Sequence, residues 1–253
     1  MNLNGQTALV TGGASGLGAQ TARQLAHRGA KVALLDVNLD LARSVASDIG
    51  GVAIACDVSS AASAEAAVLQ ARETHGPARI LVNCAGVATA QRIVGRDGPL
   101  ALDAFARVIH INLIGAFNLM RLAAADMMTL EALSDGERGV IVSTASVAAF
   151  EGQIGQAAYA ASKGGIVSLT LPAAREFAQF GIRVCAIAPG LFATPLLNTL
   201  PPNVQKTLGD SIPFPKRLGQ PSEFAMLVQH IIENQFLNGE VIRLDGGLRM
   251  PPK

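Results

Sequence analysis

The sequence predicts a single α/β domain in which about seven parallel strands form a doubly wound sheet with helices on both faces. Short β-branched or apolar runs alternate with longer stretches rich in alanine and leucine along the chain. A glycine-rich run follows the first apolar run and opens the first helical stretch. No internal repeat or low-complexity linker divides the 253 residues, so we expect residues 1–253 to fold as one domain.

The expected elements follow one another in strict alternation. Strands are predicted at residues 6–11, 30–36, 52–56, 79–83, 138–143, 182–188 and 240–244. Helices are predicted between them at residues 16–27, 39–49, 63–74, 102–128, 159–180 and 222–233. Residues 91–102 are expected to form an extra loop. The proline-rich residues 191–221 are expected to form a loop-rich substrate cover beyond the carboxyl edge of the sheet, with a purely structural crossover as the alternative.

The composition narrows the classes of function. A net charge of +1 without basic runs gives no reason to expect a nucleic acid or a membrane as partner. Residues 1–5 do not resemble a signal peptide, and the most apolar stretches are far shorter than the roughly 20 residues that span a bilayer. Cys56, Cys84 and Cys185 have no paired spacing, and the four histidines lack ligand spacing. We therefore expect a cytoplasmic protein without a metal.

The first strand leads into the glycine run at residues 11–18. Three glycines permit a tight turn, close approach of the backbone to a pyrophosphate, and close packing of the helix on the strand. The helix that follows presents unpaired N–H groups to the phosphates. The residues expected to contact a dinucleotide here are Gly12, Ser15, Gly16, Leu17 and Gly18. A plain strand-to-helix turn is the alternative, but the pattern is typical of a Rossmann-type nucleotide site.

The second strand ends at Asp36, eighteen residues after Gly18. This is near the spacing of about 20 at which an acidic side chain bonds the ribose hydroxyls of the cofactor. The carboxylate favours NAD, because it would repel the 2′-phosphate of NADP and no Arg or Lys stands at position 37 or in the glycine run. A solvated aspartate at the end of a strand is the alternative interpretation.

The third and fourth strands also end in residues that suit a nucleotide. Asp57 could accept a hydrogen bond from the adenine amino group while Val58 packs on the ring. The fourth strand closes with small residues that let the backbone lie against the adenosine ribose. These residues are Asn83, Cys84, Ala85 and Gly86.

Tyr159 and Lys163 lie four residues apart on a predicted helix and therefore share one face. A lysine ammonium there favours the tyrosinate, which would lower the pKa of the phenol from its ordinary value of about 10 and suit it to act as a general base. Tyr159 is the only tyrosine of the chain. Ser146 follows the strand at 138–143, where its hydroxyl could hydrogen-bond a substrate oxygen as the charge on that oxygen changes.

Taken in order, these motifs resemble the short-chain dehydrogenase/reductase family over nearly the whole chain. The matching positions are residues 11–18, Asp57, Asn83–Gly86, Asn112, Ser146, Tyr159–Lys163 and Pro189–Gly190. The resemblance implies that Tyr159 takes the proton of a secondary alcohol while hydride passes to the nicotinamide. It also implies that Ser146 bonds the substrate oxygen and that Lys163 holds the nicotinamide ribose.

The same resemblance assigns further residues. It implies that Asn112 holds a water that relays protons, although from the residues alone Asn112 is an ordinary polar helix residue. Further cofactor contacts implied by the family are Pro189, Gly190, Phe192 and Thr194. The family also implies a homotetramer, with helices 102–128 and 159–180 at one interface and the C-terminal segment at another.

A subgroup of the family, the type II 3-hydroxyacyl-CoA dehydrogenases, is similar in finer detail. The supporting stretches are residues 145–158, 188–192, 194–197 and 236–246, together with Cys84 and the extra loop at 91–102. This implies NAD-linked oxidation of a 3-hydroxyacyl-CoA to the 3-ketoacyl-CoA. A dehydrogenase or reductase for another secondary alcohol, such as a hydroxysteroid or small ketone, is the alternative.

The substrate side of the site rests on fewer signals. Gln153 and Gln156 lie between Ser146 and Tyr159, where their amides could reach an acyl thioester carbonyl, and exposed loop glutamines without a ligand are the alternative. Phe192, Leu196 and Leu197 could contact an acyl chain, with core or subunit packing as the equal alternative.

A third hypothesis is a nucleotide-binding regulator that keeps the sheet without turnover. The complete set of Asn112, Ser146, Tyr159 and Lys163 argues against it, because a binding protein does not need a tuned phenol.

Overall fold

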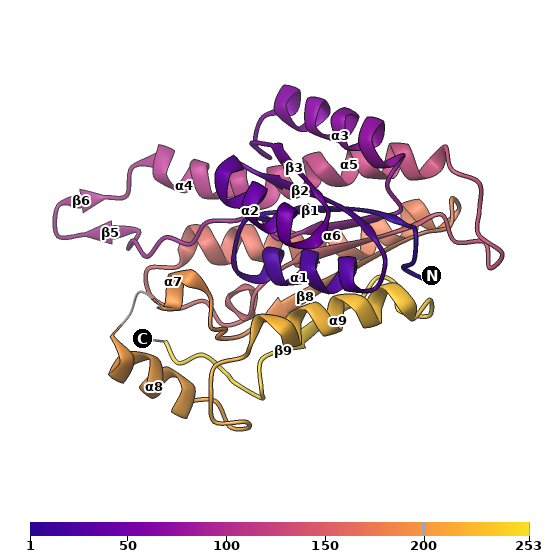
Figure 1. Cartoon of the computed structure of the whole chain (residues 1–253). Coiled ribbons are helices and arrows are strands. Elements are labelled where there is room, and N and C mark those ends of the chain that lie inside the picture. The colour runs from indigo at the N-terminus through magenta and orange to yellow at the C-terminus, as the bar shows by residue number, and fades with distance from the viewer. Residues whose placement is uncertain (199–200, 253) are drawn as a thin grey trace.

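The computed structural model describes residues 1–198 and 201–252, and for Leu196 and Asn198 it describes the backbone alone. Within these residues one seven-stranded sheet forms, in the order β3-β2-β1-β4-β7-β8-β9, and every neighbouring pair is parallel (Figure 1). Its strands are β1 (Thr7–Thr11), β2 (Lys31–Asp36), β3 (Val52–Ala55), β4 (Ile80–Asn83), β7 (Gly139–Thr144), β8 (Ile182–Pro189) and β9 (Val241–Leu244). The predicted α/β fold class is confirmed.

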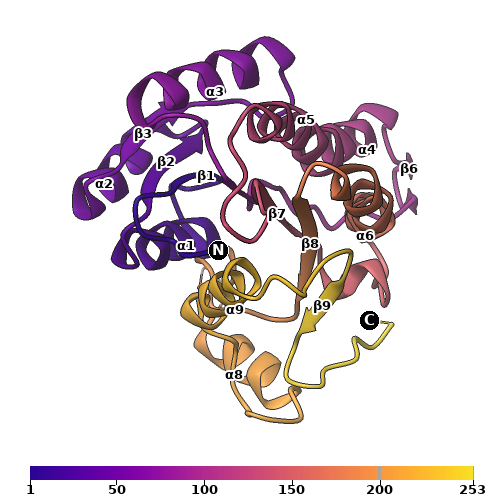
Figure 2. The same cartoon turned by 90° about the vertical axis from the view of Figure 1, so that its right-hand side faces the viewer.

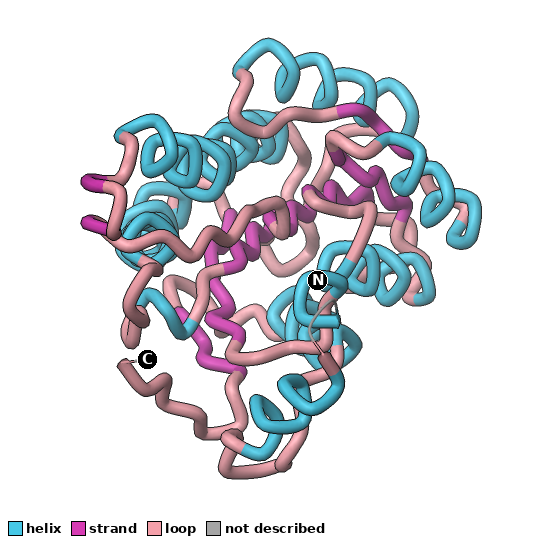
Figure 3. The backbone as a smooth tube through the Cα atoms, turned by 90° about the vertical axis from the view of Figure 1, so that its left-hand side faces the viewer, coloured by secondary structure: helices cyan, strands magenta, loops and turns pink. Residues whose placement is uncertain are grey.

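Helices cover both faces of the sheet, as Figure 2 shows. The helices are α1 (Gly16–His27), α2 (Leu39–Ile49), α3 (Ala61–His75), α4 (Leu102–Ile109), α5 (Gly115–Met128), α6 (Ala157–Ala178), α7 (Pro195–Asn198), α8 (Pro202–Asp210) and α9 (Pro221–Glu233). One face carries α1, α2 and α9, and the other carries α3, α5 and α6. Figure 3 shows the sheet between these two layers.

The two-sided packing follows from the period of the strands. Successive side chains of a strand point to opposite faces, so a strand covered on both faces must be apolar at every position. In β1, Ala8 and Val10 belong to one core with Leu25 of α1, whereas Leu9 belongs to the other with Leu119 of α5. All five residues of β1 are buried.

The topology determines where a ligand can bind. β1 pairs with β2 on one side and with β4 on the other, so the chain reverses its direction of winding between these strands. In open parallel sheets the crevice at such a switch point, beyond the carboxyl ends of the strands, is where ligands bind. The ends of β1 and β4, at Thr11 and Asn83, mark this crevice.

Three segments differ in detail from the prediction. The predicted helix 102–128 contains a π-helical turn, η1 (His110–Ile114), between α4 and α5. The predicted loop 91–102 contains a short hairpin of β5 (Val94–Gly95) and β6 (Gly98–Pro99). The proline-rich residues 191–221 contain α7 and α8, because proline is compatible with the first turn of a helix and only breaks its interior.

Among the described residues, one helical stretch, Leu102–Met128, is long and apolar enough to cross a membrane by length and composition. Half of its most apolar part is buried inside the protein, as in the core helix of a globular domain. Its turned-out apolar side chains include Ile114 and Phe117, which are about half exposed.

Candidate active site

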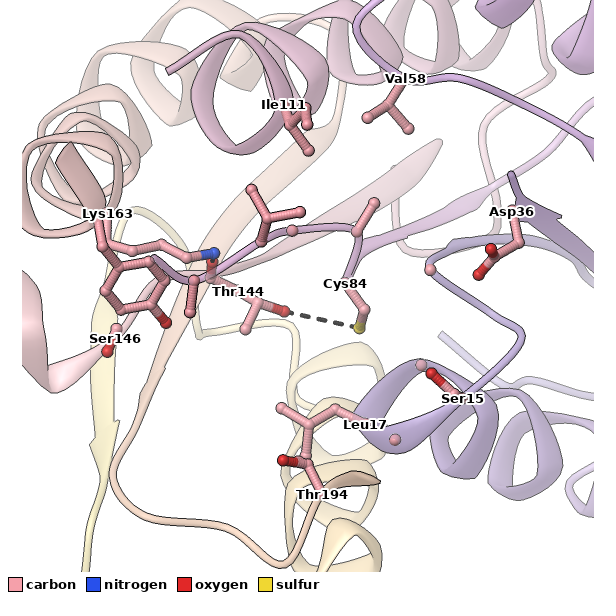
Figure 4. A pocket seen from close by; sticks show the side chains of 18 of the residues that line it. Ser15, Leu17, Asp36, Val58, Cys84, Ile111, Thr144, Ser146, Lys163 and Thr194 are labelled. Carbon is pink, nitrogen blue, oxygen red and sulfur yellow. Dashed lines mark hydrogen bonds between the residues drawn. The ribbon is translucent and has the colours of Figure 1, made fainter. Parts of the chain in front are cut away.

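A pocket of about 970 Å³ lies over the carboxyl ends of β1, β4, β7 and β8. In Figure 4, Asp36 and Ser15 lie at one end of it and Lys163 and Ser146 at the other. Most residues predicted for the site line this pocket. They are Gly12, Ser15, Gly16, Leu17, Gly18, Asp36, Asp57, Val58, Cys84, Ala85, Gly86, Ser146, Tyr159, Lys163, Pro189, Gly190, Phe192, Thr194 and Leu197.

The glycine turn fits a dinucleotide because two of its positions leave no room for a side chain. A Cβ on Gly18 would lie 2.1 Å from the carbonyl oxygen of Gly12, and a Cβ on Gly12 would lie 2.8 Å from the backbone nitrogen of Ala85. The helix α1 begins at Gly16, its first turn holds no acidic residue, and the side chain of Ser15 makes no capping hydrogen bond. The first N–H groups of α1 therefore remain available to phosphates.

Asp36 is tied to the glycine turn as well as to its own strand end. Its Oδ2 accepts a hydrogen bond from the backbone N–H of Ala14 at 3.0 Å, and its Oδ1 accepts one from Asn38 at 2.9 Å. These bonds hold the half-buried carboxylate at the end of β2 beside the turn. The contact with Ala14 had no signal in the sequence, because it joins residues on two different strand ends.

Asp57 and Val58 also line the pocket, but they differ in burial. Asp57 is exposed, and its Oδ1 accepts hydrogen bonds from the backbone N–H and the hydroxyl of Ser59 at 2.9 and 2.6 Å. Val58 is buried and packs so closely on Gly115 that a Cβ there would lie 2.5 Å from its Cγ2. The valine is therefore held rigidly where an adenine ring could pack.

The three predicted catalytic side chains of the pocket meet at its far end. Ser146, which follows β7, is buried, and its Oγ accepts a hydrogen bond from the N–H of Ala148 at 3.1 Å. Tyr159 lies in the first turn of α6, and the nearby Ser146 side chain lowers the pKa of its phenol. One turn further on, the Nζ of Lys163 lies 5.9 Å from the centre of the Tyr159 ring and donates to the carbonyl of Thr144 at 2.7 Å.

The expected lowering of the Tyr159 pKa by Lys163 is wrong for this structure. Burial raises the pKa of Tyr159, and the Ser146 side chain offsets this only in part. Burial also lowers the pKa of Lys163 to about 8. The four-residue spacing does place the two side chains together, but the ammonium bonds the Thr144 carbonyl.

Cys84 lies midway along the pocket. The hydroxyl of Thr144 donates to its Sγ at 3.6 Å (Figure 4). Burial raises the pKa of this thiol to about 11, so it stays protonated at neutral pH.

Asn112 lies behind the pocket, on the π-helical turn. Its Oδ1 accepts from the N–H of Val87 at 2.8 Å, and its Nδ2 donates to the carbonyl of Val87 and to the hydroxyl of Ser162 at 2.9 and 3.0 Å. A Cβ on Gly86 would lie 3.2 Å from the Asn112 Oδ1 and 3.6 Å from the Lys163 Nζ. The asparagine thus fixes the chain after Gly86, and its relay role stays a prediction.

Asn83 was expected at the cofactor, but the structure places its side chain in the protein interior. Its Nδ2 donates to the carbonyl of Ala116 and to the hydroxyl of Ser143, both at 3.3 Å. The cause is the two-residue period of β4, which turns Asn83 toward α5, whereas Cys84 faces the pocket.

Gln153 and Gln156 do not line the main pocket, contrary to expectation. They line a separate hollow of about 500 Å³ together with Arg92 and Ile93. The Nε2 of Gln153 donates to the carbonyl of Pro251 at 3.1 Å, and the Oε1 of Gln156 accepts from the Gln153 N–H at 3.0 Å. Their amides are engaged in holding the chain. The side chain of Leu196 lies outside the described residues.

Sequence reasoning missed one wall of the pocket, which α4 and the turn after it supply. Asp103, Ala106, Arg107 and His110 line it. Their spacing of three and four residues is that of one helix face, and this was the available signal. Among the described residues no group of three or more His, Cys, Asp or Glu could hold a metal ion.

Comparisons with known proteins identify relatives of this chain. The sequence model of the family described as "short chain dehydrogenase" matches residues 6–205. The chain is 54% identical to "3-hydroxyacyl-CoA dehydrogenase type-2" of Bos taurus over 99% of this chain and 98% of that protein. It is also 54% identical to the protein of that name from Drosophila melanogaster, over 96% and 97% of the two chains. The crystal structure of 3-hydroxyacyl-CoA dehydrogenase type-2 from Mycobacterium avium is similar, with a TM-score of 0.93 and 42% identity over 98% of each chain.

Proposed function

The chain belongs to the short-chain dehydrogenase family, and from this premise we propose that it oxidises 3-hydroxyacyl-CoA esters to 3-ketoacyl-CoA esters with NAD. Membership makes it an oxidoreductase that uses a nicotinamide cofactor and acts on a small molecule carrying a secondary alcohol or ketone. The observation that carries the finer proposal is the 54% identity to a 3-hydroxyacyl-CoA dehydrogenase over almost the full length of both chains. The grouping of Ser146, Tyr159 and Lys163 at one end of the pocket supports it.

NAD rather than NADP is proposed from the charge at the other end of the pocket. The Asp36 carboxylate is held there by Ala14 and Asn38, and residues 12–18 and 37 supply no cation to balance a 2′-phosphate. The glycine turn would hold the pyrophosphate, and Lys163 would hold the nicotinamide ribose. When bound, the nicotinamide supplies the acceptor or donor of hydride.

In the proposed reaction the protein holds the substrate oxygen and moves its proton. The hydroxyls of Ser146 and Tyr159 line the same end of the pocket and offer two neighbouring groups to that oxygen. Tyr159 takes the proton in the oxidation and returns it in the reduction. Because burial raises the pKa of Tyr159, its phenol carries a proton at neutral pH, which is the state that the reduction needs.

Support for an acyl substrate comes from the apolar wall beside the catalytic end. Phe192 and Leu197 line the pocket and belong to residues 191–221, which follow β8. Phe192 is held by a bridge to Gly219, and a Cβ on that glycine would lie 2.9 Å from its ring. Phe192 and Leu197 would contact an acyl chain while the oxygen faces Tyr159.

The proposal is tested by a substrate panel with purified protein. NADH formation would be compared for 3-hydroxybutyryl-CoA, a hydroxysteroid and a simple secondary alcohol, each with NAD and with NADP. We expect the highest kcat/KM for the CoA ester with NAD. No activity on the CoA ester would contradict the proposal, and turnover of another alcohol would then identify a different dehydrogenase.

We also propose a homotetramer in a reducing compartment such as the cytoplasm. Four apolar side chains on η1, α5 and α6 are 43–48% exposed in the single chain: Ile114, Phe117, Met128 and Leu171. Their exposure fits a face that a second copy covers. Cys56, Cys84 and Cys185 are free thiols. The molar mass of the purified protein by light scattering tests the assembly, and a monomer would contradict it.

A further inference from the structure

Residues 147–156, here called the connection, link Ser146 to helix α6, which carries Tyr159. It begins with the short turn η2 (Val147–Ala149) after Ser146 and then runs without regular structure until α6. Few backbone hydrogen bonds lie within it: the carbonyl of Val147 accepts two, and the carbonyl of Gln153 accepts one. A segment with so few internal bonds depends on outside contacts for a fixed position.

Glu151, in the middle of the connection, supplies the strongest outside contact. Its carboxylate receives two hydrogen bonds from the guanidinium of Arg243 on β9, at 2.8 and 3.1 Å. It also accepts from the N–H of Met250 at 3.0 Å and lies 3.3 Å from the Nε of Arg249. Paired Arg–carboxylate bonds of this kind fix direction as well as distance.

Arg243 joins the connection to the part of the pocket wall that contains Gly190. Its Nε donates to Asp245 at 2.7 Å, and its guanidinium lies 5.3 Å from the centre of the Phe150 ring. Asp245 in turn packs on Gly190, where a Cβ would lie 2.9 Å from the Asp245 Cβ. Gly190 lines the pocket, so this chain of contacts runs from one wall to the connection.

The C-terminal tail, residues 245–252, lies along the connection and adds two ties. The N–H of Ile154 donates to the carbonyl of Pro252 at 3.0 Å, and Gln153 donates to the carbonyl of Pro251 at 3.1 Å. The tail is itself held by Arg243, which donates to the carbonyl of Leu248 at 3.0 Å. Loss of Arg243 would therefore remove hydrogen bonds from both the carboxylate and the tail.

Burial gives this ion pair more weight than an exposed one. The side chains of Arg243 and Glu151 are 23% and 22% exposed, and that of Asp245 is 8% exposed. Isolated exposed pairs contribute little to stability, but paired hydrogen bonds within a network are the exception. The hydrogen bond from Arg243 is the largest cause that lowers the pKa of Glu151, so the carboxylate is charged at neutral pH.

We propose that Glu151 and Arg243 are positioning residues, which hold the connection and thereby set the Ser146 and Tyr159 hydroxyls against the substrate oxygen. This inference rests on the proposed function, because it assigns a role in the same reaction. Neither side chain lines the pocket, so both act through the residues they hold. Small displacements of reacting groups are costly, since a misplacement of about 1 Å lowers rates by about a hundredfold.

The test compares E151Q, R243M and R243K with E65Q as the control. Glu65 pairs with Arg121 at 2.9 Å between α3 and α5, away from the pocket, so E65Q removes the charge of an Arg–Glu pair without touching the connection. For E151Q and R243M we expect kcat to fall about tenfold with 3-hydroxybutyryl-CoA, while the Kd for NADH stays within about twofold. R243K should recover part of kcat because it can keep one bond to Glu151, and E65Q should match the wild type.

Amide hydrogen exchange provides a readout that needs no turnover. In E151Q we expect residues 150–154 to exchange about tenfold faster, with α1 and the glycine turn unchanged. Wild-type kcat and wild-type exchange in E151Q would overturn the inference. An equal loss of kcat and NADH affinity would also overturn it, because it would indicate general loosening. If the wild type leaves the CoA ester unreacted, the proposed function fails, while the exchange data still decide whether this pair holds the connection.

Discussion

The two ends of the pocket are formed by different kinds of chemical group. At the Asp36 end, the backbone makes the site: N–H groups at the start of α1, a carboxylate bonded to backbone donors, and glycines that a Cβ would displace. At the Tyr159 end, side chains make it, and burial sets their pKa values. A site of backbone groups follows from local sequence, whereas the chemistry of buried side chains depends on everything packed around them.

Replacing the phenol tests the side-chain end most severely. Tyr159→Phe keeps the ring and removes the hydroxyl that moves the proton, so we expect kcat to fall by about 10³-fold. The Kd for NADH, measured by fluorescence, should stay close to wild type because the backbone end is intact. A kcat within tenfold of wild type would remove Tyr159 from its assigned role.

A methyl group in the glycine turn tests the backbone end. Gly18→Ala places a Cβ 2.1 Å from the Gly12 carbonyl oxygen, so the turn must shift. We expect the Kd for NADH to rise about tenfold or more and the free energy of unfolding to fall by about 2 kcal/mol. Gly164→Ala is the control, because a Cβ there meets nothing within 4 Å. Equal effects of the two changes would show that close approach at Gly18 is unimportant.

At the same end of the pocket, the charge of Asp36 makes a smaller contribution, to the preference for NAD over NADP. Asp36→Ala should lower the ratio of kcat/KM with NAD to kcat/KM with NADP about tenfold, because repulsion of the 2′-phosphate is lost. Asp40→Ala is the matched control: its side chain is 93% exposed and pairs only with Arg43 among the contacts described. An unchanged ratio in Asp36→Ala would leave cofactor preference to other residues.

The smallest predicted effect concerns stability and pH. The pKa of Lys163 is lowered by burial from 10.5 to about 8, so between these values the unfolded chain binds more protons than the folded one. The free energy of unfolding of the wild type therefore rises with pH through this window. Below about pH 8 the wild type bears the full cost of burying the Lys163 charge.

Lys163→Met removes that cost. The Tm of the variant minus the Tm of the wild type should be largest at pH 7 and should be roughly 5 °C smaller at pH 10. Thermal unfolding at both values measures the difference. A difference in Tm that is independent of pH would show that the ammonium is not desolvated as the structure indicates.

The connection between Ser146 and Tyr159 illustrates where sequence reasoning stops. Both hydroxyl residues were predicted, and so was their order along the chain. Gln153 and Gln156 were predicted in the same pocket because they lie between those residues, yet their amides face the C-terminal tail and the hollow beside the hairpin. Closeness in sequence did not predict the direction of a side chain in an irregular segment, because distant residues hold that segment.

The sequence by itself determined the parallel sheet, the glycine turn, the acidic end of β2 and the pairing of Tyr159 with Lys163 on one helix face. Each of these depends on local periodicity or on steric limits within a few residues. Only the tertiary structure decided that Asn83 turns inward, that Lys163 bonds Thr144, and that burial raises the pKa of Tyr159. These outcomes depend on dielectric and packing, which come from residues far apart in the chain.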